Sequence, residues 1–203
     1  MIRLIAIAIA VWQLVGCSVG DNYRPRTGDI VFQTAKSLQS DAIQLATHSP
    51  YSHMGIVYLR DGKPLVFEAV QPVKLTPLDA WIASGERHHF VAKRLRLADL
   101  VLTPEHLQRM REVGEVLLRR DYDPYFEWSD QRIYCSELVW KVFDRGAGVR
   151  LGKLQVIEDF DLSSLAVKAR LKERYADDVP LGETVVSPVA IFKHPALTTV
   201  YEN

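Results

Sequence analysis

The chain has 203 residues, and its 25 lysine and arginine side chains are balanced by 25 aspartate and glutamate side chains. This length suits one domain with its own hydrophobic core. The balanced charge argues against a nucleic-acid-binding protein, which needs a basic patch. The two cysteines, Cys17 and Cys135, stand in different sequence contexts, and each context predicts a different role.

Residues 1–16 have the proportions of a bacterial secretory signal. Arg3 precedes an apolar stretch that is shorter than the roughly 20 residues of a transmembrane span. Leu14-Val15-Gly16-Cys17 resembles a bacterial lipobox, in which the cysteine thiol is diacylated and becomes the new N-terminus. We therefore expect a lipoprotein signal peptide at 1–16, a lipidated tether at 17–26 and a domain at 27–203. The alternative is an ordinary signal peptide with a chance cysteine.

Ser18, rather than an aspartate that would signal inner-membrane retention, follows Cys17. By resemblance to Gram-negative lipoproteins, this favours the cell envelope, with the lipid anchor in the outer membrane and the domain facing the periplasm. If Cys17 carries lipid, Cys135 has no disulfide partner within the chain. A lone thiol in an exported protein is a candidate nucleophile.

The first half of the chain is predicted to contain a β-hairpin. Residues 53–60 and 63–70 are apolar runs on either side of Asp61-Gly62, a pair that favours a two-residue turn because both residues can adopt positive φ. The remaining signals in this half predict a strand at 30–33, a helix at 37–47, a helix at 77–84 capped by Thr76, and a strand at 89–95.

The second half is predicted to be mainly helical. Thr103 as N-cap and Pro104 in the first turn open the longest helix, which extends to about Arg119. Residues 120–132 are polar and aromatic without periodicity, and we interpret them as a candidate lid. The pattern further predicts a helix at 136–144 stopped by Gly146 and Gly148, a helix at 161–175, and a turn at Ser187-Pro188 between short strands.

The hairpin register brings two chemically useful side chains together. With the turn at 61–62, Glu68 lies opposite Gly55, and His53 becomes its diagonal neighbour on the same face, roughly 7–8 Å away at the backbone. A carboxylate beside an imidazole fixes the tautomer and stabilises the imidazolium. His53 considered alone also fits an ordinary strand-edge histidine.

Cys135 supplies a thiol at a predicted helix start. A neighbouring imidazolium and a helix N-terminus both favour a thiolate, and the backbone N–H of Cys135 is a candidate oxyanion donor. A cysteine alone is more often a small buried hydrophobe, but together with His53 and Glu68 it predicts a nucleophile. Tyr51, Tyr134 and Trp128 are candidate residues of a substrate groove. The histidines show no spacing that indicates a metal site, and we expect no cofactor.

Four segments carry a family resemblance: Thr27–Phe32, Ser52–Gly55, Val66–Ala69 and Tyr134–Leu138. They resemble the permuted papain-like amidases of the YiiX/YaeF group, circularly permuted relatives of the NlpC-type cell-wall peptidases. The resemblance implies an α+β fold, with an antiparallel sheet packed against helices that include the nucleophile helix. It also implies Cys135 as nucleophile, His53 as base and acid, and Glu68 as the orienting group.

The preferred interpretation is a lipid-anchored cysteine hydrolase that cleaves an amide, such as a peptide bond in peptidoglycan, through a thioester. A lipid acyltransferase or deacylase similar to lecithin:retinol acyltransferase is the second interpretation. A non-catalytic module that binds a peptide or an acyl chain is the third. A redox role for Cys135 is disfavoured because the chain offers no resolving cysteine.

Overall fold

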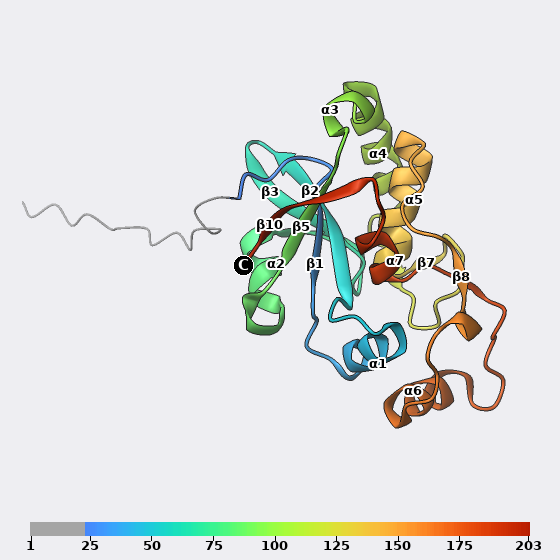
Figure 1. Ribbon diagram of the computed structural model, residues 1–203. Coiled ribbons are helices and arrows are strands. Elements are labelled where there is room, and N and C mark those ends of the chain that lie inside the picture. The colour runs from blue at the N-terminus through green and yellow to red at the C-terminus, as the bar shows by residue number, and fades with distance from the viewer. Residues whose placement is uncertain (1–22) are drawn as a thin grey trace, which may run out of the picture.

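The computed structural model describes residues 23–203 (Figure 1). The predicted signal peptide, the lipidation of Cys17 and most of the tether lie outside these residues. Tyr23 is buried, and its hydroxyl donates to Asp29, so the ordered packing begins near the end of the predicted tether. In the described part of the chain, no helix combines the length and apolar character that a membrane crossing requires.

The fold is α+β, as predicted, and its centre is an antiparallel sheet with the strand order β10-β5-β1-β2-β3-β4. In chain order, the strands of this sheet are β1 (Ile30–Gln33), β2 (His53–Arg60), β3 (Lys63–Glu68), β4 (Lys74–Pro77), β5 (Val91–Leu95) and β10 (Leu197–Glu202). The chain therefore adds its last strand to the edge that β5 would otherwise expose, a pairing that no local signal predicted.

The predicted hairpin is confirmed as β2 and β3. Asp61 and Gly62 both adopt positive φ, at 51° and 74°. Arg60 pairs with Lys63, and the register continues to Ile56 opposite Phe67. This is the two-residue turn expected from the Asp-Gly pair, whose twist matches that of the flanking strands.

One face of the sheet is covered by α4 (Pro104–Leu117) and α5 (Cys135–Ala147), which pack against each other (Figure 1). Thr103 caps α4 as predicted. The prediction that Gly146 stops the second helix is wrong, because Gly146 lies inside α5 and Gly148, with φ 68°, forms its C-cap. A Cβ on Gly146 would lie 2.5 Å from Cγ of Met110, so the glycine permits the close approach of the two helices.

The opposite face of the sheet is covered by α2 (Leu78–Ser84), followed by the 3₁₀ turn η1 (Glu86–His88). Trp81 and Phe90 are buried there against Val31, Val57 and Val66 of alternating strand positions. Thr76 does not cap this helix as predicted. It lies in β4 instead, and its side chain faces Glu68.

A third group of elements lies at one end of the sheet, where α1 (Leu38–Thr47) packs on α6 (Leu165–Tyr175) (Figure 1). Ser37 and Ser164 are the N-caps, so α6 begins later than expected. The second strand predicted near Ser187 is wrong, because Ser187 caps α7 instead. The remaining elements are α3 (Ala98–Val101), β6 (Asp121–Tyr122), β7 (Arg132–Ile133), β8 (Gln155–Val156), η2 (Ile157–Asp159), β9 (Thr184–Val185) and α7 (Pro188–Phe192).

Candidate active site

His53 and Glu68 are in direct contact at the end of the hairpin. Nε2 of His53 lies 2.6 Å from Oε2 of Glu68, and both side chains are buried. The space for this contact exists because residue 55 is glycine. A Cβ there would lie 2.4 Å from Cγ1 of Val66 and 2.8 Å from the carbonyl oxygen of Phe67.

The second oxygen of Glu68 is held by Thr76. The Thr76 hydroxyl donates to Oε1 over 2.5 Å, so both carboxylate oxygens have fixed partners. The sequence analysis missed this role because it depends on β4, which places Thr76 opposite Val66. The only sequence signal was a threonine two residues after the short Pro72-Val73-Lys74 segment, too weak to define a strand.

Cys135 is the first residue of α5 and is 4% exposed. Its Sγ lies 3.9 Å from the carbonyl oxygen of Ser52, the residue before His53. The thiol is also close enough to the imidazole of His53 to raise its pKa. Because Nε2 of the ring contacts Glu68, the remaining nitrogen, Nδ1, is the one available to the thiol.

The charges of this group reinforce one another. Burial by itself lowers the pKa of His53, but hydrogen bonds with Cys135 and Glu68 and the negative charge of both partners raise it from 6.5 to about 10. Burial would raise the pKa of Glu68, but the hydrogen bonds from His53 and Thr76 hold it below its ordinary value. The arrangement therefore favours an imidazolium between two acidic groups.

Two groups are candidate donors to an oxyanion. The first is the backbone N–H of Cys135, which lies in the first turn of α5, where amides have no acceptor within the helix. The second is Tyr122, whose hydroxyl accepts a hydrogen bond of 2.5 Å from Nε2 of Gln39 and so keeps its own proton available. Burial and the charge of Cys135 both raise the pKa of Tyr122, which therefore remains a proton donor. This role was not predicted.

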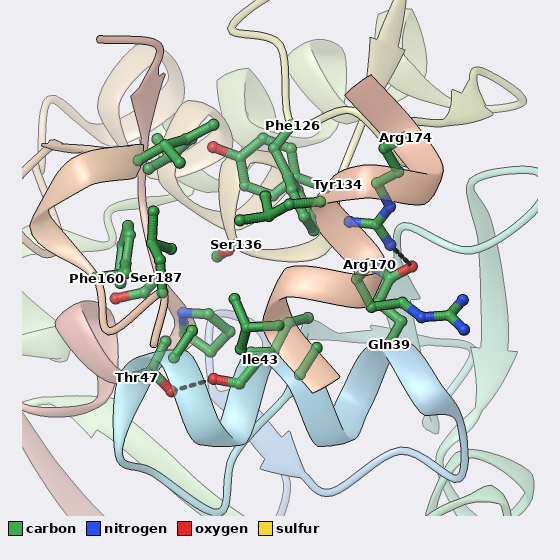
Figure 2. A pocket seen from close by; sticks show the side chains of 18 of the residues that line it. Gln39, Ile43, Thr47, Phe126, Tyr134, Ser136, Phe160, Arg170, Arg174 and Ser187 are labelled. Carbon is green, nitrogen blue, oxygen red and sulfur yellow. Dashed lines mark hydrogen bonds between the residues drawn. The ribbon is translucent and has the colours of Figure 1, made fainter. Parts of the chain in front are cut away.

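Cys135 lines an apolar cavity of about 120 Å³, part of whose wall, including Tyr134 and Phe126, is shown in Figure 2. Cys135 and Tyr134 lie in its wall, α1 contributes Ile43, and Phe126 closes it from the loop before α5. Figure 2 also shows Arg174 of α6, which donates to Oε1 of Gln39 over 2.7 Å. The wall is almost entirely hydrocarbon and suits an aliphatic group.

Two residues flanking the nucleophile hold the far wall of this cavity. The Tyr134 hydroxyl accepts the backbone N–H of Val186 over 3.1 Å, and Ser136 Oγ donates to the carbonyl oxygen of Val186 over 2.7 Å. Both backbone groups of Val186 are thus bound by the neighbours of Cys135. The cavity wall at Val186 is therefore hydrogen-bonded to the residues on either side of Cys135.

A second hollow, a cleft of about 380 Å³, adjoins the first. His53 lines the cleft, whereas Cys135 lines the cavity. Gln39 and Ile43 of α1 line both, so the two spaces adjoin along this helix. The residues that line the cleft are Ala35, Ser37, Gln39, Ser40, Ile43, Ser52, His53, Ala69, Val70, Gln71, Tyr122 and Pro124.

The predicted groove residues divide into two groups. Tyr134 lines the cavity. Tyr51 and Trp128 line neither the cavity nor the cleft, contrary to the prediction. Tyr51 stacks on Phe192 with ring centroids 4.3 Å apart, and Trp128 packs edge-on against Trp140. Both aromatic rings serve packing, since their neighbours come from elements distant in the sequence.

The predicted lid at 120–132 is anchored rather than free-standing. Buried Asp123 accepts the backbone amides of Tyr125 and Glu127, and Tyr125 packs edge-on against Tyr175 of α6. Phe126, held in this segment at φ 56°, contributes its ring to the cavity. The segment therefore forms part of the cavity wall.

A buried ion pair supports the start of α5. Glu137 accepts from Lys141 over 2.6 Å, and both side chains are at most 2% exposed. The other oxygen of Glu137 accepts the backbone N–H of Tyr134 at 3.4 Å, which helps to cap the helix. Burial raises the pKa of Glu137 to about 7, although Lys141 opposes this effect.

Comparisons with known proteins identify the family and the fold. The family described as permuted papain-like amidase enzymes, YaeF/YiiX, C92 family, matches residues 24–201. The chain is 52% identical over 178 residues to the uncharacterized protein YiiX of Escherichia coli K12, covering 88% of this chain and 87% of that protein. A crystal structure of YiiX from Escherichia coli O157:H7, described as a metalloprotein, superposes with a TM-score of 0.85 and 51% identity, covering 89% of this chain and 99% of that one.

Residues 23–203 contain no group of three or more His, Cys, Asp and Glu side chains positioned to hold a metal ion.

Proposed function

Because the chain belongs to the family of permuted papain-like amidases and is a cysteine hydrolase, we propose that Cys135, His53 and Glu68 perform its chemistry. The observation that carries the proposal is a chain of neighbouring groups: the Cys135 thiol, which lies beside Ser52 and raises the pKa of His53, the His53 ring, and Glu68, which lies 2.6 Å from that ring. Such a chain turns a thiol into a nucleophile and supplies a proton donor for the leaving group.

The proposed reaction is amide hydrolysis in two steps. The Cys135 thiolate attacks the carbonyl carbon, and the backbone N–H of Cys135 and the Tyr122 hydroxyl stabilise the oxyanion. A C–S bond forms, the C–N bond breaks, and the imidazolium of His53 gives its proton to the departing nitrogen. Water, deprotonated by the now neutral imidazole, then releases the acyl group and restores the thiolate.

The apolar cavity favours an acyl substrate over a peptidoglycan stem peptide. A stem peptide would place polar amides against a hydrocarbon wall, which costs free energy unless each is paired. For scale, a dry apolar cavity of roughly 150 Å³ accommodates benzene, so a cavity of about 120 Å³ matches a chain of about six carbons. We propose an aliphatic N-acyl substrate, and lipid deacylation is the closely related alternative.

The test of the proposed function uses the full chain with Cys17→Ser, which leaves Cys135 as the only thiol. Incubation with p-nitrophenyl hexanoate should give a hexanoyl adduct on Cys135, detected by mass spectrometry of the quenched protein. The rate of adduct formation should fall at least 10³-fold in His53→Ala, by analogy with triad mutations. If a Cys135→Ala variant hydrolyses hexanoyl amides at the full rate, the proposal is refuted.

We also propose that a lipid on Cys17 anchors the protein in the bacterial cell envelope. The proposal is supported by the Leu14-Val15-Gly16-Cys17 sequence. Cells grown with an alkyne-labelled fatty acid should incorporate the label into the wild-type chain but not into Cys17→Ser. Label retained in Cys17→Ser would place the lipid elsewhere.

A further inference from the structure

We propose that the cleft beside His53 binds the leaving half of the substrate, and that this half is a small neutral amine bearing hydroxyl or carbonyl oxygens. The inference rests on the proposed function, because it assigns the two sides of the bond that Cys135 would cleave. Its starting point is that the two reacting side chains open onto different spaces: Cys135 onto the cavity and His53 onto the cleft.

The roles of the two side chains fix the direction of the substrate. Cys135 bonds to the carbonyl carbon, so the acyl half lies on its side, in the apolar cavity. His53 gives its proton to the departing nitrogen, so the amine half lies on its side, in the cleft. Since Gln39 and Ile43 line both spaces, one molecule can extend from the cavity to the cleft across the thiol.

The chemistry of the cleft differs from that of the cavity. Its floor carries the hydroxyls of Ser40 and Ser52, which are 2.6 Å apart and almost fully buried. Ser52 Oγ accepts the amide of Ala35, and Ser40 Oγ accepts from Gln44. Only one of the two hydroxyl protons lies between the serines, so the other is available to a ligand.

A third hydroxyl stands at the entrance to the cleft. Ser37 Oγ accepts the amide of Ser40, as the cap of α1, and its own proton is also available. Two donors of this kind call for oxygen acceptors on the ligand, such as hydroxyl or carbonyl groups. Gln71 is not available in the same way, because it donates to Asp121 and accepts from the amide of Tyr122.

Apart from the His53 imidazolium, whose charge is already balanced by Glu68, the cleft offers no full charge to a charged leaving group. Among residues 23–203, those that line it include no Asp, Glu, Lys or Arg, and His53 is its only ionisable side chain besides Tyr122. Asp121, the acid bound to Gln71, lies outside the lining. A carboxylate or an ammonium group placed in the cleft would lose hydration without gaining a counter-ion. A neutral group with oxygen acceptors fits best.

The experiment compares hexanoyl amides of four amines of similar size with the full chain carrying Cys17→Ser. They are ethanolamine (neutral, hydroxyl), glycine (anionic), ethylenediamine (cationic) and propylamine (apolar). The kcat/KM for the ethanolamide should exceed that for each of the other three at least tenfold. A ratio below ten for any of the three overturns the inference.

A reversed substrate tests the direction. N-acetylhexylamine has a small acyl half and an apolar leaving half, so its kcat/KM should be at least 100-fold below that of the hexanoyl ethanolamide. Comparable values would mean that the cavity takes the leaving group, and the assignment would be wrong.

The four amines also differ in intrinsic reactivity as leaving groups. A comparison of two protein variants on the same two amides cancels that difference. Val70→Asp should raise the ratio of kcat/KM for the ethylenediamine amide to that for the ethanolamide about tenfold, relative to Val70→Asn, which has the same size without the charge. An equal ratio in the two variants would overturn the inference.

Failure of this inference is distinguishable from failure of the proposed function. The adduct from p-nitrophenyl hexanoate does not depend on the amine series. If Cys135 is acylated normally but the four amides and the two Val70 variants show no preference, the cleft assignment fails and the proposed function stands. If no substrate acylates Cys135, the proposed function fails first.

Discussion

At the scale of single residues, the site depends on how completely Glu68 is held. One oxygen contacts His53 and the other accepts from Thr76, so the carboxylate cannot rotate away from the imidazole without breaking a hydrogen bond. Hydrogen bonds to a charged group contribute about 1.5–3 kcal/mol each. We therefore expect Thr76 to be a positioning residue that acts on Cys135 through Glu68 and His53.

Replacement of Thr76 tests this role. Thr76→Val should lower kcat/KM for a hexanoyl amide about tenfold, equivalent to about 1.4 kcal/mol in the barrier. It should also move the acid limb of the pH–rate profile to higher pH, because the bond from Thr76 helps to hold the pKa of Glu68 down. Thr76→Ser keeps the hydroxyl and should retain both properties. A wild-type profile in Thr76→Val would mean that Glu68 does not need this partner.

Gly55 is the second residue on which the contact depends. Gly55→Ala should destabilise the fold by about 1–3 kcal/mol, because the new methyl group would overlap Val66 and the backbone oxygen of Phe67. Urea unfolding measures the change. Gly182→Ala is the matched control, since a Cβ there meets no atom within 4 Å. Equal stability of both variants and the wild type would show that β2 and β3 adjust freely.

At the scale of elements, α5 carries more than the nucleophile. Its first turn holds Tyr134 through Glu137, and the Glu137–Lys141 pair ties the helix to the loop before it through Ser129 and Asp130. A buried ion pair of this kind costs much of its attraction in lost hydration. The raised pKa of Glu137 expresses that cost.

The sign of the pH dependence follows from this shift. Because the pKa of Glu137 rises from 4.5 to about 7 on folding, the folded chain holds more protons than the unfolded chain between these values, and stability falls as pH increases through this window. Glu137→Gln should remove this contribution, of up to about 3 kcal/mol. Unfolding free energies of both proteins at pH 4.5 and 7.5 measure it.

Asp130→Asn provides the comparison for that experiment. The bonds from Arg145 and Lys141 lower the pKa of Asp130 to about 2, so its contribution is constant above pH 4.5. A difference between wild type and Glu137→Gln that does not change with pH would contradict the assignment to Glu137.

The elements also show what local sequence signals can and cannot reveal. The His53–Glu68 contact was predictable because the Asp61-Gly62 turn fixes the register of both strands. The caps Ser37, Thr103 and Ser164 belong to the same local kind, although only the second was assigned in advance. Thr76, Tyr122 and Val186 reach the site from β4, from β6 and from the segment before α7, and pairing at such sequence distances leaves no short-range pattern.

Errors in the prediction have the same origin. Gly146 resembled a helix stop, but the contact with Met110 explains it. Tyr51 and Trp128 were candidates for the groove, with packing of the domain as the alternative for Trp128, and their rings pack on Phe192 and Trp140. These predictions required knowing which residues are buried, and burial depends on neighbours from distant parts of the sequence.

At the scale of the whole molecule, the site collects side chains from nearly the full length of the described chain. His53 and Glu68 come from the hairpin, Cys135 from the central helix, and Val186 from the segment before α7. The last strand, β10, pairs with β5 on the far edge of the same sheet. The complete site therefore cannot form from one local segment alone.

Because the site draws on distant segments, we expect structure and activity to be lost together in one unfolding transition. In a urea titration, the midpoint for hydrolysis of a hexanoyl amide and the midpoint for far-ultraviolet circular dichroism should coincide, as in a two-state transition. Activity lost well before the dichroism would instead show that α1 and α6 separate from the sheet in an earlier step.

The binding of Val186 by Tyr134 and Ser136 has a consequence for selectivity. An acyl chain that is too long for the cavity must push its far wall outward, and that wall pulls on the two residues on either side of the thiol. We therefore expect a bound acyl chain that is too long to displace the Cys135 thiol from the position needed for attack. Along a series of acyl lengths, the turnover number should decline while the Michaelis constant stays nearly level, so the enzyme would reject poor substrates by reacting slowly with them rather than by releasing them.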